Sequence, residues 1–274
     1  MSTSRLCRAC NLEHFEEPRM VAAMRRLLPY LAEEFPEYPK GREHRKAWEF
    51  AQLILGLEDL GALGPGAFVL SVGAGHEEPM YYLTNLARWV FACDLYGSSS
   101  FSGHEAQAGV LVDPDRYARC PYRRGRLVVQ HMDARDLRFE DATFDVAYSL
   151  SSIEHFGGKQ EARQALEEMR RVLRPGGLAA VATEVVVNGQ PGWSEPGLEL
   201  FSPEDLLELA GLQGLEPVEP VDFSVSPATT QAVVPLRQAV EDAARGKVDY
   251  PHLVLEHQGR LYTSVMLFLR RVPG

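Results

Sequence analysis

The sequence of 274 residues predicts an α/β fold, with a doubly wound, mostly parallel sheet, an antiparallel C-terminal strand pair and an N-terminal helical cap. Three observations support this prediction. From residue 67 onward, short apolar runs alternate with amphipathic segments, which is typical of a parallel sheet covered by helices. Two glycines closely follow the first of these runs. Two further apolar runs end the sequence around a tight turn.

The first 62 residues are predicted to form a helical extension. Apolar side chains recur at helical spacing over residues 17–35, with Pro29 interrupting or kinking the helix. A second helix is predicted over residues 43–60, and the breaker-rich stretch GALGPG follows it. We therefore expect an N-terminal cap over residues 1–62 and a ligand-binding domain over residues 63–274.

Five apolar runs are the predicted strands of the parallel sheet: AFVLSV, WVFACD, RLVVQH, FDVAYSL and GLAAVATE. Between the last two, helical spacing over residues 160–173 predicts a βαβ crossover that ends at RPGG. The runs HLVLEH and RLYTSVMLFLRR flank Gln258 and Gly259 and predict an antiparallel hairpin. Residues 97–125 and 185–200 have no clear period, so we expect substrate-binding loops or lids there.

Composition and charge limit the classes of function. The 45% hydrophobic and 24% charged fractions are those of a soluble globular protein. No run approaches the roughly 18 apolar residues of a membrane span, and the N-terminus lacks the apolar core of a signal peptide. The net charge of −10 argues against nucleic-acid binding, because phosphate contacts need a dense Lys/Arg face. We therefore expect a cytoplasmic protein with no membrane or nucleic-acid partner.

The four cysteines are too few and too scattered for a disulfide framework. Cys7 and Cys10 form a single C-x-x-C, and His14 adds a third possible zinc ligand. Structural zinc sites usually need four ligands at recognisable spacing. We therefore expect reduced thiols and no metal site.

Gly73 and Gly75 follow the first predicted strand and form the G-x-G of a Rossmann-like βα turn. Glycines let the backbone pass close to a ligand, and the following helix offers free N–H groups. Asp94 ends the second strand about 20 residues later, where an acid can accept hydrogen bonds from ribose hydroxyls. Both a nicotinamide dinucleotide and S-adenosylmethionine fit these features.

The local charge favours the second of these ligands. Glu77 and Glu78 stand beside the predicted helix N-terminus, where they would repel a pyrophosphate. S-adenosylmethionine has no phosphate and carries an ammonium group and a sulfonium. Asp133, just after the third strand, lies where an acid can accept a hydrogen bond from the adenine amino group.

At this point the chain resembles the class I S-adenosylmethionine-dependent methyltransferases, in particular the small-molecule branch related to ubiquinone and sugar methyltransferases. The resemblance covers Phe68 to Leu269 and rests on the segments VLSVGAGHE, FACDLYG, HMDARDLRFEDATFDVAYSLSSIEHF and RRVLRPGGLAAVATE. It implies a cofactor site in which the glycine turn lines the ligand, the second strand end binds the ribose, the third binds the adenine and the fourth binds the methionine end. The residues concerned are Gly73, Ala74, Gly75 and Glu77 in the glycine turn; Asp94 and Leu95 at the second strand end; Met132, Asp133 and Ala134 at the third; and Ser149, Leu150 and Ser151 at the fourth.

Two positions depart from the family pattern. The glycine motif of the family usually begins with an acid that helps to bind the methionine moiety, and Ser71 stands there. The family usually has a third small residue where this chain has Glu77. Glu77 is therefore a candidate partner for the ammonium group of the cofactor.

His155, in the segment SSIEHF, is the candidate catalytic residue. Methyl transfer from a sulfonium is an in-line displacement, so a base is needed only where the acceptor must lose a proton. One role for His155 is to accept that proton as a neutral imidazole. The alternative is that His155 shapes the pocket, as the corresponding residues do in relatives. Glu184 and Asn188, near the end of the fifth strand, are expected to be solvated, with a role in holding a divalent cation as the alternative.

The sequence thus predicts a methyltransferase that moves a methyl group from S-adenosylmethionine to an oxygen or nitrogen of a small metabolite. Sugar and secondary-metabolite intermediates are the candidate acceptors, and S-adenosylhomocysteine is the second product. One alternative is a catalytically silent S-adenosylmethionine-binding sensor or scaffold protein. Another is a nicotinamide-dependent oxidoreductase. The motifs name neither the acceptor nor an oligomeric state.

Overall fold

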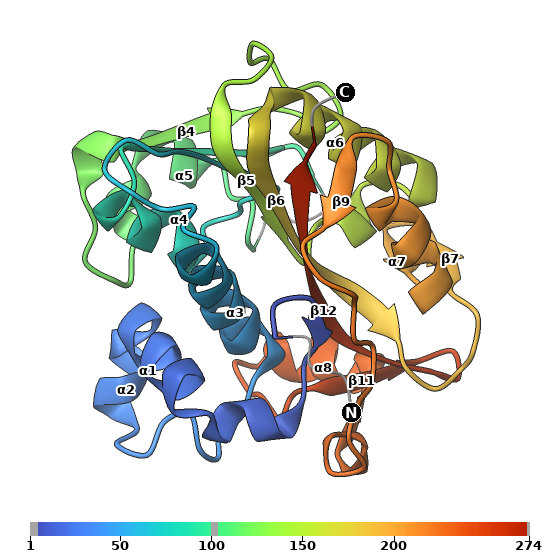
Figure 1. The fold of residues 1–274 in the computed structure, drawn as a ribbon. Helices are drawn as coiled ribbons and strands as arrows, with labels where there is room; N and C mark the ends of the chain where they lie inside the picture. The colour runs from blue at the N-terminus through green and yellow to red at the C-terminus, as the bar shows by residue number, and fades with distance from the viewer. Residues whose placement is uncertain (1–4, 100–103, 273–274) are drawn as a thin grey trace.

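A computed structural model describes residues 5–99 and 104–272. Its centre is a parallel array in the order β6-β5-β2-β3-β4, in which the chain order reverses between β2 and β5 (Figure 1). These strands are β2 (Phe68–Val72), β3 (Trp89–Asp94), β4 (Leu127–His131), β5 (Phe144–Leu150) and β6 (Leu173–Val186). All five lie on the predicted runs, which confirms the mostly parallel, doubly wound sheet.

The sheet ends in antiparallel strands, as predicted. Strand β11 (Val254–His257) turns directly into β12 (Arg260–Arg271), and β12 pairs antiparallel with β6 along most of its length. Three short strands extend this edge: β10 (Val233–Pro235) beside β11, and β1 (Arg8–Ala9) and β9 (Leu215–Pro217) beside β12. Within the described residues the sheet has ten strands.

Strand β6 is longer than its predicted run. The segment RPGG was expected to end the preceding helix, yet it belongs to the strand, which starts at Leu173. The ladder between β5 and β6 contains an irregularity where Phe144 pairs with Leu173 and Val146 pairs with Leu178. This bulge absorbs the extra residues, so the strand continues through the glycines.

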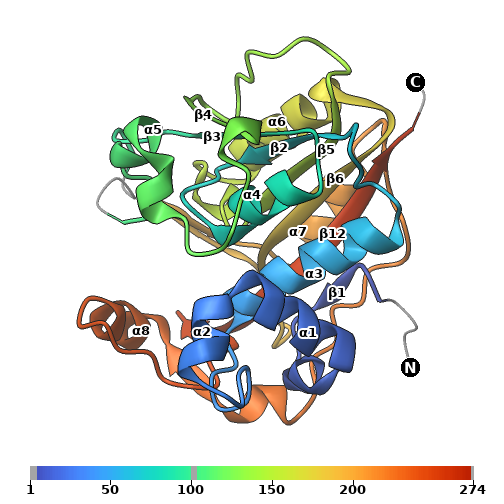
Figure 2. The ribbon, with the colours of Figure 1, turned by 90° about the vertical axis from the view of Figure 1, so that its left-hand side faces the viewer.

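Helices cover both faces of the sheet. One face carries α6 (Lys159–Val172) and α7 (Pro203–Ala210), and the opposite face carries α3 (Arg45–Asp59) and α4 (Glu78–Tyr82) (Figures 1 and 2). Each face has its own apolar core, because successive strand residues point to opposite sides. The amphipathic spacing predicted over residues 160–173 is confirmed, since its apolar side chains are those that α6 buries.

The N-terminal residues form α1 (Pro18–Leu27), α2 (Pro29–Glu34) and α3. A break at Leu28 separates the first two helices, which confirms the interruption predicted at Pro29. Buried side chains of α1 and α3 share one apolar cluster with the sheet. The division of the chain at residue 62 into a cap and a domain stays a prediction.

The two stretches without a clear period contain only short elements among their described residues. These are α5 (Gly109–Val112), η3 (Pro114–Tyr117) and η4 (Arg124–Arg126) in the first, and the hairpin of β7 (Trp193–Glu195) with β8 (Leu198–Leu200) in the second. Part of the first stretch, residues 100–103, lies outside the described residues. The remaining helix, α8 (Leu236–Ala243), lies near β10 and β11.

Candidate active site

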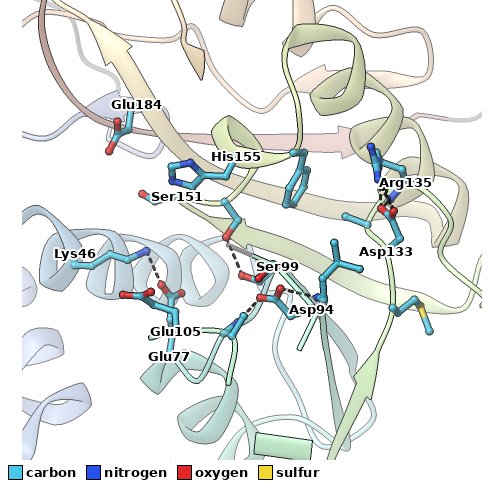
Figure 3. A pocket seen from close by; sticks show the side chains of 18 of the residues that line it. Lys46, Glu77, Asp94, Ser99, Glu105, Asp133, Arg135, Ser151, His155 and Glu184 are labelled. Atoms are coloured by element: carbon cyan, nitrogen blue, oxygen red, sulfur yellow. Dashed lines mark hydrogen bonds and ion pairs between the residues drawn. The ribbon is translucent and has the colours of Figure 1, made fainter. Parts of the chain in front are cut away.

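A cavity of about 310 Å³ lies at the carboxyl ends of β2, β3, β4 and β5 (Figure 3). This is the edge of a doubly wound sheet at which ligands bind. The cavity is lined by His44, Arg45, Lys46, Gly73, Gly75, Glu77, Asp94, Leu95, Ser99, Glu105, Ala106, Met132, Asp133, Ala134, Arg135, Ser151, Ser152, His155, Phe156 and Glu184. Every predicted site residue is among them except Ala74, Ser149 and Leu150.

The glycine turn approaches the cavity closely. Gly73 and Gly75 have φ values of 64° and 48°, a region that favours glycine. A Cβ atom at Gly73 would lie 2.6 Å from the Cβ atom of Ser152. Ala74 is buried and does not line the cavity, and its N–H donates to the carbonyl of Cys93. A side chain at Gly73 would therefore displace Ser152, which also lines the cavity.

Asp94 is held at the end of β3 by two backbone groups. Its Oδ2 atom accepts a hydrogen bond of 2.8 Å from Gly75 N–H, and its Oδ1 atom accepts one of 2.7 Å from Leu95 N–H. Burial raises the pKa of Asp94, and the two N–H groups oppose that rise. A carboxylate has about four lone-pair positions, so two remain for the hydroxyl donors of a ribose.

Met132, Asp133 and Ala134 line the far end of the cavity, where the adenine was predicted to bind. The Asp133 carboxylate pairs with Arg135, with 2.6 Å between Oδ2 and Nη2, and it also accepts from the Arg135 N–H. These hydrogen bonds lower the pKa of Asp133. Arg135 was not predicted to lie in the site, and its pairing holds the Asp133 carboxylate in place.

The end of β5 presents Ser151 and Ser152 to the cavity, whereas Ser149 is buried within the sheet. Ser151 has a φ of 47°, and its hydroxyl donates to Glu49 at 2.8 Å. Ser152 donates to the carbonyl of Gly73 at 2.8 Å, which ties the end of β5 to the glycine turn. The left-handed backbone at Ser151 is uncommon for a residue with a side chain and is of the kind found at ligand sites.

Sequence reasoning predicted the helix α3 but named none of the residues that it contributes to the cavity. His44, Arg45 and Lys46, at its N-terminus, line the cavity. Lys46 forms an ion pair with Glu77, with 2.5 Å between Nζ and Oε1. The only signal for these residues in the sequence is the charged run GREHRK, which is also typical of a solvated helix start.

The expectation that Glu184 is a solvated strand end is wrong. Glu184 is 5% exposed, and its Oε1 atom lies 2.5 Å from Nη2 of Arg45. Arg45 approaches because α3 packs against β12, the neighbour of β6. Asn188 does not join this pair, since its amide donates to the carbonyl of Gly259.

His155 lies on η5 (Ile153–His155) and lines the cavity (Figure 3). Its Nδ1 atom is 2.7 Å from the carbonyl oxygen of Gly197. A carbonyl oxygen only accepts, so Nδ1 carries the proton and Nε2 holds the lone pair of the neutral ring. Burial lowers the pKa of His155, which favours the neutral form. A base role of the ring would therefore use Nε2.

Glu154, the neighbour of His155, is a buried residue of the protein interior. It is 1% exposed, does not line the cavity and accepts a hydrogen bond of 2.8 Å from the Thr183 hydroxyl. Burial and the nearby Glu184 raise the pKa of Glu154 to about 8. Of the two residues, only His155 lines the cavity.

Among the described residues, no group of three His, Cys, Asp or Glu side chains is arranged to hold a metal ion. Cys7 and Cys10 are buried free thiols, and the sulfur of Cys7 lies 3.2 Å from the N–H of Phe268. Burial raises the pKa of Cys7 to about 11, so this thiol stays protonated. In the part of the chain that the structure covers, no helix has the length and apolar character to cross a bilayer.

Comparison with known proteins places this site in context. Residues 70–181 match the family model of a methyltransferase domain. An O-methyltransferase of Pyrenophora dematioidea is 36% identical over 109 residues, which are 36% of this chain and 39% of that relative. The chain thus spans less than half the length of this relative.

Two solved structures share the fold. The [4+2]-cyclase SpnF has a TM-score of 0.57 at 21% identity, covering 93% of this chain and 97% of its own. A Burkholderia thailandensis 1,6-didemethyltoxoflavin-N1-methyltransferase with bound S-adenosylhomocysteine has a TM-score of 0.52 at 17% identity, covering 93% and 91%. At these identities the likeness concerns the fold alone.

Proposed function

We propose that this chain, whose residues 70–181 match a methyltransferase domain, is a class I S-adenosylmethionine-dependent methyltransferase that transfers the methyl group of this cofactor to a hydroxyl oxygen of a small-molecule acceptor. The observation that carries the proposal is the single cavity that joins the glycine turn, Asp94 and Asp133 to His155. The net charge of −10 supports a small molecule rather than a nucleic acid as the acceptor. A cytoplasmic location stays a prediction.

The residues of the cavity fit this cofactor. Gly73 and Gly75 line the cavity with backbone alone, and the free lone pairs of Asp94 suit two ribose hydroxyls. Asp133 and the backbone of Ala134 line the cavity where they can form hydrogen bonds with the edge of an adenine. Acidic side chains at the cavity, Glu77 and Glu184 among them, suit a ligand with a sulfonium and an ammonium group.

When bound, S-adenosylmethionine supplies a methyl group already activated by the sulfonium. The protein then holds the acceptor oxygen in line with the methyl carbon and keeps water away. We propose that His155 accepts the hydroxyl proton at Nε2, while Gly197 holds the ring through Nδ1. An O-methyltransferase relative supports oxygen as the accepting atom.

Calorimetric titration with S-adenosylhomocysteine tests the cofactor site, with NADH as the control ligand. We expect micromolar binding of S-adenosylhomocysteine and none of NADH. Asp94→Ala removes the ribose contact and should weaken binding by about tenfold or more, since charge-assisted hydrogen bonds are among the strong ones. Binding of NADH alone would contradict the proposal.

An acceptor screen tests the reaction. Purified protein, S-adenosylmethionine and a panel of hydroxylated small molecules should yield a methylated product and S-adenosylhomocysteine in equal amounts. If the protein binds the cofactor tightly but methylates none of a broad panel, and His155→Ala changes nothing, a sensor or scaffold role replaces the enzyme.

A further inference from the structure

The Lys46–Glu77 ion pair occupies a defined end of the cavity. In Figure 3, Asp133 and Arg135 lie at one side, Asp94 in the middle, and Lys46, Glu77 and Ser151 at the other side. If Asp94 binds the ribose and the adenine lies toward Asp133, the remaining part of the cofactor extends toward Lys46 and Glu77. That part is the amino-acid end, which carries one ammonium and one carboxylate.

Lys46 is anchored independently of Glu77. Its Nζ atom lies 3.2 Å from Glu49 and 3.0 Å from the carbonyl of Leu150, in addition to 2.5 Å from Glu77. Glu49 is fully buried and accepts further hydrogen bonds from Ser151 and Ser264. The ammonium group would therefore stay in place if Glu77 moved away.

The carboxylate of Glu77 forms the other half of the pair. It is the residue before α4 (Glu78–Tyr82), and Lys46 is the ion-pair partner found for its carboxylate among the described residues. Although burial opposes the charge on Lys46, the carboxylates of Glu49 and Glu77 raise its pKa. Burial raises the pKa of Glu77, and the ion pair with Lys46 opposes that rise. The pair thus keeps two otherwise costly charges in a partly enclosed site.

We infer that Lys46 binds the carboxylate of the methionine moiety and Glu77 its ammonium, so that α3 forms part of the cofactor site. This inference rests on the proposed function. An amino-acid zwitterion carries the two charges in a form complementary to the Lys46–Glu77 pair. When the zwitterion binds, two ion pairs replace the Lys46–Glu77 pair: the ligand carboxylate pairs with Lys46, and the ligand ammonium pairs with Glu77. No charge is left unpaired. Glu77 thereby takes the role of the acid that usually begins the glycine motif of the family, where this chain has Ser71.

Three ligands separate this role from a general structural one. S-adenosylhomocysteine has the complete amino-acid end, its decarboxylated analogue keeps only the amine, and methylthioadenosine lacks both charged groups. Calorimetry with the full chain measures the dissociation constant of each. Lys46→Met, of similar length, should weaken S-adenosylhomocysteine about tenfold or more. It should leave methylthioadenosine and the decarboxylated analogue within about twofold.

Glu77→Gln provides the second variant, because it leaves the Lys46–Glu49 contact intact. It should weaken S-adenosylhomocysteine and the decarboxylated analogue alike, with methylthioadenosine unchanged. Lys40→Met is the matched control, since Lys40 is an exposed lysine of the same N-terminal region. This control should bind all three ligands as the unmodified protein does.

The possible results are distinct. If Lys46→Met weakens methylthioadenosine as much as S-adenosylhomocysteine, Lys46 acts through the structure of the site and the inference is wrong. The same holds if neither variant changes the affinity for S-adenosylhomocysteine. If the unmodified protein binds none of the three ligands, the proposed function itself fails.

Discussion

The imidazole of His155 is hydrogen-bonded through Nδ1 to the carbonyl oxygen of Gly197, between β7 and β8, at 2.7 Å. This contact fixes the tautomer of the ring. It also connects the candidate base to the stretch of residues 185–200 that the sequence predicted to be a binding loop. The loop therefore orients a side chain of the site, and substitutions in it should affect catalysis.

A base role for His155 predicts a specific pH dependence. Only the neutral ring accepts a proton, so the rate should fall as the pH drops through the pKa of His155. Because burial lowers this pKa, the acidic limb of kcat/KM should lie below the ordinary value of about 6.5. His155→Ala should remove this limb and reduce kcat about 100-fold with an acceptor from the screen. Unchanged kcat and an unchanged pH profile would leave His155 with a pocket-shaping role.

Gly73→Ala should damage the cofactor site. The new methyl group would meet Ser152 at 2.6 Å, and the φ of 64° adds backbone strain. We expect S-adenosylhomocysteine to bind about tenfold more weakly or worse, measured by calorimetry. Gly41→Ala is the matched control, because Gly41 has a φ of 72° but open space around the added atom. It should lose about 1 kcal/mol of stability and keep its affinity for S-adenosylhomocysteine.

His14 should make stability depend on pH. It is buried and accepts a hydrogen bond from Asn11 N–H, and burial lowers its pKa to about 4. The unfolded chain binds a proton near pH 6.5 and the folded chain only near pH 4. The stability associated with neutral His14 is therefore complete above pH 6.5 and is lost as the pH falls toward 4, by up to about 3 kcal/mol.

Urea unfolding between pH 7.5 and 4.5 measures this loss. His14→Gln should show a smaller fall in the free energy of unfolding over this range than the unmodified protein. His104→Gln, which changes an exposed histidine, should follow the unmodified curve. Equal slopes for all three proteins would show that His14 does not titrate differently on folding.

Gly56→Ala tests the contact between α3 and the sheet. A Cβ atom at Gly56 would lie 2.1 Å from the ring of Phe268, which is fully buried in β12. Neither the helix nor the strand can yield without repacking, so we expect a loss of about 2 kcal/mol in urea unfolding. Gly66→Ala, with nothing near the added atom, should be close to neutral. A neutral Gly56→Ala would mean that the contact is adaptable.

The sequence predicted the parts of the site that depend on local pattern. The strand ends, the glycine turn and Asp94 are adjacent along the chain to apolar runs of clear period, and parallel strands bring their ends to one edge. The hairpin of β11 and β12 was recognisable for the same reason. Strands β1, β9 and β10 were not, because two or three residues are too few to show a period.

The contribution of α3 could not be predicted, because it depends on contacts between distant residues. Arg45 meets Glu184 across 139 positions of the sequence, and Lys46 meets Leu150 across 104. Charged residues at a helix start usually face solvent, and only the packing of α3 against the sheet turns them into the cavity. The same packing buries Glu184, whose position at a strand end suggested exposure.

The pairing of β12 with segments from the other end of the chain affects the order of events during synthesis. The N-terminal strand β1 pairs with Val265 and Met266, and α3 lies against Phe268. The ribosome synthesises the chain from its N-terminal side, so β1 and α3 emerge long before β12, the strand that they contact. Lys46 and Arg45 therefore cannot settle beside the glycine turn until β12 has left the exit tunnel. The nascent chain should become able to retain the nucleoside ligand only after β12 (Arg260–Arg271) has emerged from the ribosome.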